Sequence, residues 1–373
     1  MAEEEPTDRR SKALRTESRV RGMMLGLGIG DTLGAARGNL PPSGVLRAGV
    51  STQLACFTAE GVIRAMVRAS HKGICHPPGV VLHAYCRWAA LQGIEVQRMR
   101  RRWGSSMGEG EWPDGWLAGV PVLAERRGSA PATVAALSRI ETPHDEIATA
   151  SRGCHALTRS LPIAVVGIGW AQQAGDFAGL THGDSAARSA TAQAAVLLHH
   201  CLTSTPPDDD HTGRSDRAVR QALEAGAATL GDLDERVTDD ARRRLLAAMQ
   251  HAAGQPAQAA VLARLAPDAT APSALLGGIY TAAWFPGRAQ LRDALDFAAG
   301  APDGDSVACV TGALLGAVHG FEALPLDLVS RHELAWVLDT LARDMLSETT
   351  DSPSGSEYVR GWDPHWWDGY PGW

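Results

Sequence analysis

The sequence lacks any apolar run long enough to cross a lipid bilayer. The longest apolar runs, residues 161–170 and 307–318, fall well short of the roughly 20 residues that a spanning helix needs. A secretory signal core is also missing, because only about seven apolar residues follow the charged N-terminal segment before Asp31. We therefore expect a cytoplasmic protein that neither spans nor binds a membrane.

The chain is also short of positive charge and of paired cysteines. Its formal net charge is -7, which gives no long-range attraction to phosphate backbones, so we expect no nucleic-acid partner. Its 6 cysteines show no CxxC spacing, and such cysteines in an intracellular chain are normally reduced. Buried free thiols are the expectation.

Alternating apolar and polar residues, the pattern of a half-buried strand, are almost absent. Apolar residues instead recur at helical spacing in nearly every long segment. The sequence predicts an all-α protein with one compact multi-helix domain. We expect a polar N-terminal arm over residues 1–18, the helical domain over 19–347, and a Trp-rich tail over 348–373.

Two segments carry glycine at four-residue spacing. Gly22, Gly26 and Gly30 would give one smooth helix face, which lets another helix backbone approach closely, and Asp31 follows it with a carboxylate. A second face of this kind begins at Gly312 and continues through Gly316 to Gly320. The glycine-rich first segment has no preceding strand and no GxGxxG spacing, so we reject a dinucleotide fingerprint.

Asp303, Asp305 and Ser306 lie together at a predicted helix start. Asp and Ser side chains cap helices well, because they accept hydrogen bonds from free backbone N–H groups. Three oxygen-bearing side chains could also bind one hard cation. The motif by itself favours capping.

The tail holds Trp362, Trp366, Trp367 and Trp373 within twelve residues. Four indoles left in water would forgo several kcal/mol of burial, at roughly 25 cal/mol per Å². We expect the tail to pack on its own domain. A peptide that binds a protein partner is the alternative.

Together, six stretches in this order resemble the ADP-ribosylglycohydrolase family, which includes the dinitrogen-reductase-activating glycohydrolases. The resemblance covers nearly the whole chain from about Arg21, and its motifs are GMMLGLGIGDTLGA, STQLACFTAEGVIRA, SRGCHALTRSLPIAVVG, LTHGDS, DGDSVACVTGALLGAVHG and WWDGYPGW.

The resemblance implies an all-helical fold with a central cleft. It implies two Mg²⁺ or Mn²⁺ ions in that cleft, and release of ADP-ribose by hydrolysis at the anomeric carbon. The family's second ligand motif remains as Asp303, Asp305 and Ser306, whereas its Thr-Asp-Asp motif falls here on Gly49, Val50 and Ser51. The family's loop glutamate falls near Gly38. We expect at most one weakly held ion.

The resemblance also assigns the residues that would face ADP-ribose. They are Asp31, Gly153, Cys154, His155, Arg159 and His182. The phosphate-binding loop of the family usually has glycine where this chain has His155, whose side chain would limit close approach of a diphosphate.

The sequence thus predicts an ADP-ribosylglycohydrolase-like protein with a degraded metal site and with absent or strongly reduced activity, which still binds ADP-ribose or a related nucleotide. One alternative is an active ADP-ribosyl hydrolase that uses one metal or rearranged ligands. The other is a non-catalytic protein that binds a protein partner, for example through the C-terminal tail.

Overall fold

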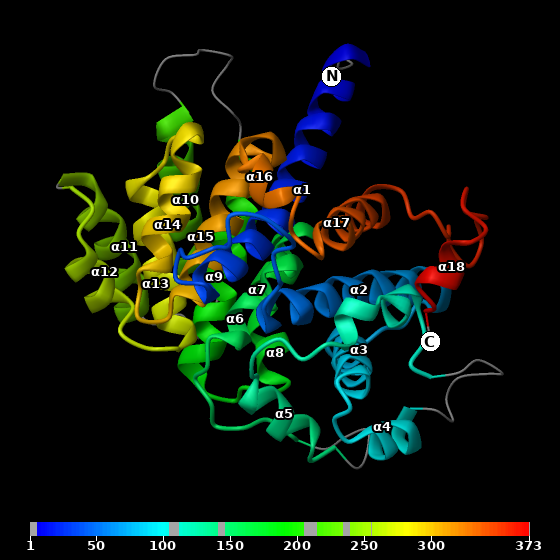
Figure 1. Cartoon of the computed structure of the whole chain (residues 1–373). Helices are drawn as coiled ribbons and strands as arrows, with labels where there is room; N and C mark the ends of the chain where they lie inside the picture. Colours follow the sequence, from blue (N-terminus) through cyan, green and yellow to red (C-terminus); the bar gives the residue numbers. More distant parts are fainter. Residues whose placement is uncertain are drawn as a thin grey trace. The chain divides into compact units, whose positions relative to one another are not determined.

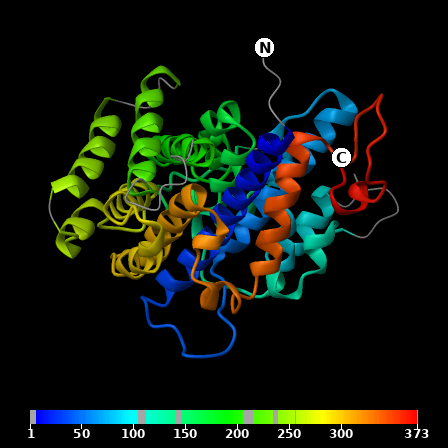
Figure 2. The same cartoon turned by 90° about the horizontal axis from the view of Figure 1, so that it is seen from above.

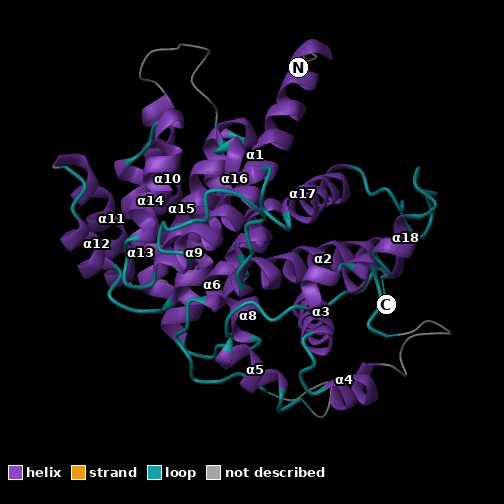
Figure 3. Ribbon diagram, viewed as in Figure 1, coloured by secondary structure: helices purple, strands orange, loops and turns teal. Residues whose placement is uncertain are grey.

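The structure, a computed structural model, describes residues 6–103, 112–140, 146–204, 215–233, 239–254 and 256–372. It is 70% helical. Within these ranges, extended backbone pairs only as isolated bridges, and Figure 3 shows helices joined by loops. The all-α prediction is confirmed.

The chain divides into two compact units. Figure 1 labels the helices. The first comprises the described parts of Met1–Leu46, Val196–Ala269 and Ser273–Arg343, and the second those of Arg47–Ala195, Thr270–Pro272 and Asp344–Trp373. The helices α9 (Ser185–Thr203), α13 (Ala271–Trp284) and α17 (Ala335–Thr350) contribute to both units.

The other helices of the first unit are α1 (Pro6–Ala35), α10 (Ser215–Leu233), α11 (Asp239–Gly254), α12 (Ala259–Leu265), η4 (Arg288–Gln290), α14 (Leu291–Ala299), α15 (Gly304–His319), η5 (Phe321–Ala323) and α16 (Leu326–Val329). Those of the second unit are α2 (Val50–Lys72), α3 (Pro77–Leu91), α4 (Val96–Trp103), η1 (Trp116–Gly119), η2 (Pro121–Ala124), α5 (Pro131–Leu137), α6 (His155–Thr158), η3 (Leu161–Val165), α7 (Ile168–Gln172), α8 (Ala174–Gly179) and α18 (Trp366–Gly369).

The first unit is built on the pairing of α1 with α15 (Figure 2). A Cβ atom added at Gly26 would lie 2.2 Å from the carbonyl oxygen of Gly312, and one at Gly22 would lie 2.4 Å from that of Gly316. Gly30 meets the backbone of Ala308 in the same way. The two small-residue faces predicted from the sequence therefore pack against each other, backbone to backbone.

The helix α1 begins before residue 19, where the helical domain was predicted to start. It begins at Pro6 and runs to Ala35 without interruption, so residues 6–18 of the predicted arm continue directly into its buried part. Glu17, in that segment, forms ion pairs with Arg21 at 3.5 Å and with Arg343 of α17 at 3.6 Å.

The second unit is built on α2 and α3, which pack together. Most of α2 is buried, from Val50 to Ala65, and the helix ends at Gly73, whose positive φ of 65° suits glycine. Two prolines, Pro77 and Pro78, start α3, where their missing N–H groups would have no helical partner.

Part of the C-terminal tail packs in the second unit. Trp366 is buried, and its Nε1 donates to Oε2 of Glu348 at 2.9 Å. Trp367 meets His71 of α2 edge to face, with ring centres 4.9 Å apart. Trp362 is 64% exposed, and Trp373 lies outside the described residues.

A search of the described residues for a helix long and apolar enough to cross a membrane found none.

Candidate functional site

A short backbone pairing in the second unit brings together several of the residues expected to face a nucleotide. The Thr149 N–H donates to the carbonyl oxygen of Thr181 at 3.0 Å, and the Gly183 N–H donates to that of Thr149 at 2.6 Å. Thr149 and His182 are thus paired in an isolated parallel bridge. This pairing places His182 beside the loop that runs toward α6.

Gly153 lies at the point where this loop approaches His182. Its N–H donates to Oγ of Ser151 at 3.1 Å. A Cβ atom at this position would lie 3.2 Å from that Oγ and 3.3 Å from Nε2 of His182, so only a glycine fits here without displacement. Cys154 is buried, and His155, which is half-buried, begins α6.

His182 is only 1% exposed, and its Nδ1 is 2.8 Å from Oγ1 of Thr181. Burial, reinforced by the positive charges of Arg159 and His155, lowers the pKa of His182 to about 2. The imidazole is therefore neutral at neutral pH and presents Nε2 toward Gly153. It can exchange a hydrogen bond with a ligand but carries no charge to attract one.

Arg159 is fully buried, so it does not reach the surface of the loop. Its Nη1 donates to Oγ1 of Thr133 at 3.1 Å and its Nη2 to the carbonyl oxygen of Phe177 at 3.3 Å, while its guanidinium carbon lies 4.3 Å from the centre of the Tyr85 ring. Burial lowers its pKa, and among the described residues no carboxylate pairs with it. Among the residues that the structure describes in the second unit, Arg159, directly after α6, is thus a buried cation without a carboxylate partner.

The start of α2, where the family has its first ligand motif, carries no carboxylate. Gly49 is the N-cap residue and makes no side-chain cap, and Val50 and Ser51 are buried. The Ser51 hydroxyl oxygen accepts a hydrogen bond from the Thr158 hydroxyl at 3.0 Å. These residues bind the helix to α6 and supply no charged oxygen.

The second motif lies in the first unit, at the start of α15. Asp303 is the residue before the helix, and its carboxylate accepts a hydrogen bond from the Ser306 hydroxyl. The Ser306 N–H donates to Oδ1 of Asp305 at 2.9 Å. The three residues therefore hydrogen-bond to one another, but the Asp303 side chain makes no cap hydrogen bond to the backbone of α15. Asp31, only 2% exposed, follows the glycine face of α1 in the same unit.

Gly49, Val50 and Ser51 offer no carboxylate to a divalent ion. Hard divalent cations take six or more oxygen ligands, with several carboxylates among them when binding is tight. In the part of the chain that the structure describes, no group of three or more His, Cys, Asp or Glu side chains is placed to hold a metal ion.

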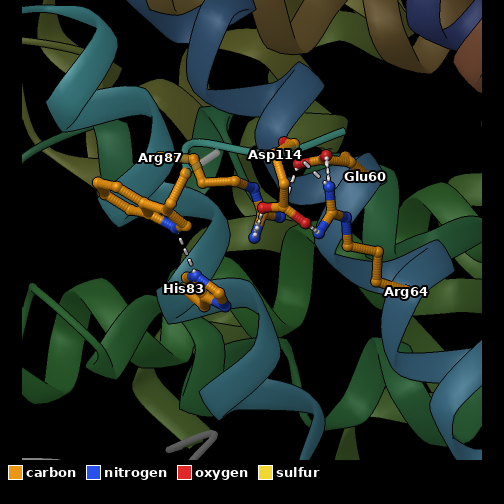
Figure 4. Close-up of polar contacts among 6 residues, drawn as sticks. Glu60, Arg64, His83, Arg87 and Asp114 are labelled. Atoms are coloured by element: carbon orange, nitrogen blue, oxygen red, sulfur yellow. Dashed lines mark hydrogen bonds and ion pairs between the residues drawn. The ribbon is translucent and has the colours of Figure 1, made fainter. Parts of the chain in front are cut away.

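One charged cluster was not anticipated from the sequence. Glu60 of α2 accepts hydrogen bonds from Arg64, at 2.8 Å, and from Arg87 of α3, also at 2.8 Å (Figure 4). Asp114, from the loop before η1, pairs with Arg64 at 2.7 Å and lies 3.9 Å from Arg87. We call Glu60, Arg64, Arg87 and Asp114 the charge cluster. Its two arginines and two carboxylates balance in formal charge.

The loop before η1 closes on the cluster through a glycine. Gly115 has a φ of 84°, and a Cβ atom there would lie 1.9 Å from Nη2 of Arg64. Burial alone would raise the pKa of Asp114, but Arg64 and Arg87 outweigh it and the pKa is lowered. Asp114 therefore stays ionised and completes the cluster.

His83 of α3 lies beside the charge cluster and is neutral. Burial, with Arg87, Arg64 and Arg102 acting in the same direction, holds its pKa well below the ordinary value. Its Nε2 accepts a hydrogen bond from Nε1 of Trp112 at 2.9 Å (Figure 4).

The sequence held one signal for this cluster. Arg87 interrupts the otherwise apolar stretch VVLHAYCRWAAL, and Glu60 and Arg64 are four residues apart on the strongly apolar α2. Charged residues in such positions are rarely buried unless they are paired. Their partners, however, come from other elements and from a loop, which sequence spacing does not reveal.

Comparison with known proteins supports the resemblance. The sequence model of the ADP-ribosylglycohydrolase family matches residues 12–354. A search of curated proteins found no match. A solved structure described as an ADP-ribosylglycohydrolase-related protein complex shares the fold, with a TM-score of 0.60 and 21% identity over 90% of this chain and 100% of that chain. The chain belongs to the ADP-ribosylglycohydrolase family.

Proposed function

We propose that this protein binds ADP-ribose or a related nucleotide and that its hydrolytic activity is absent or strongly reduced. The observation that carries this proposal is the start of α2. Gly49, Val50 and Ser51 supply no carboxylate there, and the Ser51 hydroxyl is hydrogen-bonded to Thr158.

The loss of these carboxylates bears on metal binding. Ligand charge tunes affinity for hard cations over many orders of magnitude. With the acidic residues of only one motif left, we propose at most one Mg²⁺ or Mn²⁺ ion, weakly held near Asp303 and Asp305. A metal in this family would act as a Lewis acid and would orient the substrate, each worth several kcal/mol of transition-state stabilisation.

The residues around Gly153 support retained binding. The buried positive charge of Arg159 has no carboxylate partner among the described residues. The loop from Ser151 to His155 lies close to His182, near Gly153. A cation without a counter-ion favours an anionic ligand nearby, because attraction is stronger where water is excluded. The neutral His182 adds a hydrogen-bonding group without repelling a cationic or anionic substrate.

The test is release of ADP-ribose from a peptide that is ADP-ribosylated on arginine, measured with Mg²⁺, with Mn²⁺ and with chelator. We expect no release above the rate of the peptide alone, or a slow release that metal changes little. Metal-dependent turnover of many equivalents per protein would refute the proposal. A Ser51→Ala variant is the control, because it removes a hydroxyl but no charge and should leave the result unchanged.

A further inference from the structure

The last turns of α17 present two carboxylates to the C-terminal tail. Asp344 and Glu348 are four residues apart, so they lie on one helix face. Oε2 of Glu348 accepts from Trp366, at 2.9 Å, and Oδ2 of Asp344 accepts from the Tyr370 hydroxyl. Both contacts lie within the second unit.

The two aromatic residues that make these contacts are also four residues apart. Trp366 and Tyr370 are 8% and 3% exposed, and their ring centres are 5.0 Å apart. A pair of acids on one helix thus meets a pair of aromatic donors on the segment that contains α18. Two matched contacts fix both the position and the direction of the tail.

This interface contains no cation for its two acids. Among the described residues, neither Asp344 nor Glu348 forms an ion pair with a Lys, Arg or His side chain. The one charged group that acts on Asp344 in the described part of the chain, Asp363, is itself acidic. Burial raises the pKa of both Asp344 and Tyr370; Asp363 raises that of Asp344 further, and Asp344 and Glu60 raise that of Tyr370. The guanidinium of Arg68 on α2 donates to the carbonyl oxygen of Gly372 at 3.2 Å.

The tail covers the loop that completes the charge cluster. A Cβ atom at Gly369 would lie 3.7 Å from Cδ1 of Trp116, the first residue of η1, which directly follows Asp114 and Gly115 in the chain. A Cβ atom at Gly372 would lie 3.1 Å from the backbone nitrogen of Arg68 on α2. The tail therefore contacts η1, which follows the loop of the charge cluster, and α2, which carries Glu60 and Arg64.

We propose that residues 363–372 form a detachable latch over η1 and α2, held by the two carboxylates Asp344 and Glu348. We call this segment the C-terminal latch. Its aromatic side chains supply most of the attraction, and the acids beneath it make the docked position sensitive to pH.

The direction of this sensitivity follows from burial. Burial raises the pKa of Asp344 to about 6, and raises that of Glu348, although the hydrogen bonds from Tyr370, Trp366 and Ser352 oppose the shift. The docked state therefore keeps a proton that a solvated carboxyl group loses near pH 4. Docking becomes stronger as pH falls below about 6, and this gain is lost as pH rises through about 6.

Hydrogen exchange of the full chain, corrected for intrinsic rates, tests the proposal. The amides to follow are those of Asp368 and Tyr370, which donate to the carbonyl oxygens of His365 and Trp366. We expect their protection to be about tenfold greater at about pH 5 than at about pH 8, as linkage with Asp344 requires. The amides of α15 should show no such change.

Variants separate the latch from general effects of pH. The Asp344→Asn, Glu348→Gln double variant keeps both hydrogen-bond acceptors but cannot titrate, so its protection should be the same at both pH values. Asp368→Asn is the matched control, because Asp368 belongs to the same segment but is 79% exposed beside His365. It should retain the tenfold difference.

Equal protection of the two amides at both pH values in the parent protein would overturn the proposal. So would an undiminished difference in the double variant. If the double variant does not fold, Tyr370→Phe decides the point. Removal of the hydroxyl that contacts Asp344 should reduce the protection at both pH values, but it should retain or enlarge the ratio between them, because the hydrogen bond from Tyr370 opposes the upward pKa shift of Asp344. Loss of the pH dependence in Tyr370→Phe would overturn the proposal.

Discussion

Arg159 and Tyr85 stack in the interior of the second unit, with the guanidinium carbon 4.3 Å from the ring centre. Tyr85 in turn shares a hydrogen bond with Thr58 of α2, at 2.8 Å. Arg159 thereby connects α2 and α3 with Thr133 and with the carbonyl oxygen of Phe177 near the end of α8. Burial of this charged side chain costs free energy, since no carboxylate among the described residues offsets its desolvation.

Replacement of Arg159 by methionine should separate stability from binding. Apolar residues of similar size often replace buried charges at little cost, so we expect a free energy of unfolding within about 1 kcal/mol of the parent. ADP-ribose affinity should fall by about tenfold, or about 1.4 kcal/mol, because the substitution removes the positive charge that we propose attracts the nucleotide. Urea unfolding and calorimetry measure the two quantities. A loss of several kcal/mol in stability with unchanged affinity would show that Arg159 has a structural role alone.

Replacement of Glu60 by alanine should be strongly destabilising. It would leave Arg64 and Arg87, both buried, with Asp114 as their only remaining acidic partner in the described residues. Removal of one partner from a buried ionic group typically costs about 3–5 kcal/mol. Asp327→Ala is the control, since its pair with Arg292 is about half exposed and should contribute less than about 1 kcal/mol. Similar losses in the two variants would mean that the buried charge cluster contributes no more to stability than an exposed ion pair.

The protein should become less stable as pH falls, in part because unfolding allows His182 to bind a proton. Its pKa is lowered from 6.5 to about 2 in the folded state, so below about pH 6.5 the unfolded chain binds a proton that the folded chain does not. Stability from this group is therefore complete above that pH and is lost as pH falls. Between about pH 7 and pH 5, a His182→Asn variant should lose roughly 2 kcal/mol less than the parent in urea unfolding. Identical pH profiles would contradict burial of a neutral imidazole.

The pairing of α1 with α15 can be tested at a single atom. A Cβ atom at Gly312 would lie 2.1 Å from the carbonyl oxygen of Gly26, and backbone cannot move aside easily. We expect Gly312→Ala to cost about 1–3 kcal/mol or more, as overpacking does. Gly169 of α7 has no atom within 4 Å of an added Cβ, so Gly169→Ala should be neutral or stabilising by up to about 1 kcal/mol. Equal melting temperatures for the two variants would contradict the close approach.

Local patterns in the sequence predicted part of this structure. The four-residue glycine spacing predicted two smooth helix faces, and they pack on each other because only a backbone can fill the space beside a missing side chain. Helical periodicity likewise predicted the all-α fold. The charge cluster could not be predicted, because Asp114 reaches Arg64 from a loop 50 residues further along the chain. The surroundings of Arg159 could not be predicted either, because its hydrogen-bond partners Thr133 and Phe177 come from other elements.

The most direct test of the proposed function is calorimetric titration of the protein with ADP-ribose, in Mg²⁺ and in chelator. We expect dissociation constants on the order of micromolar to millimolar, equivalent to about -8 to -4 kcal/mol, and nearly equal under the two conditions. Nanomolar affinity that appears only with Mg²⁺ would contradict the account, because it would require an assembled metal site. Absence of binding at millimolar ADP-ribose would equally contradict it, since the proposed function depends on retained recognition of the nucleotide.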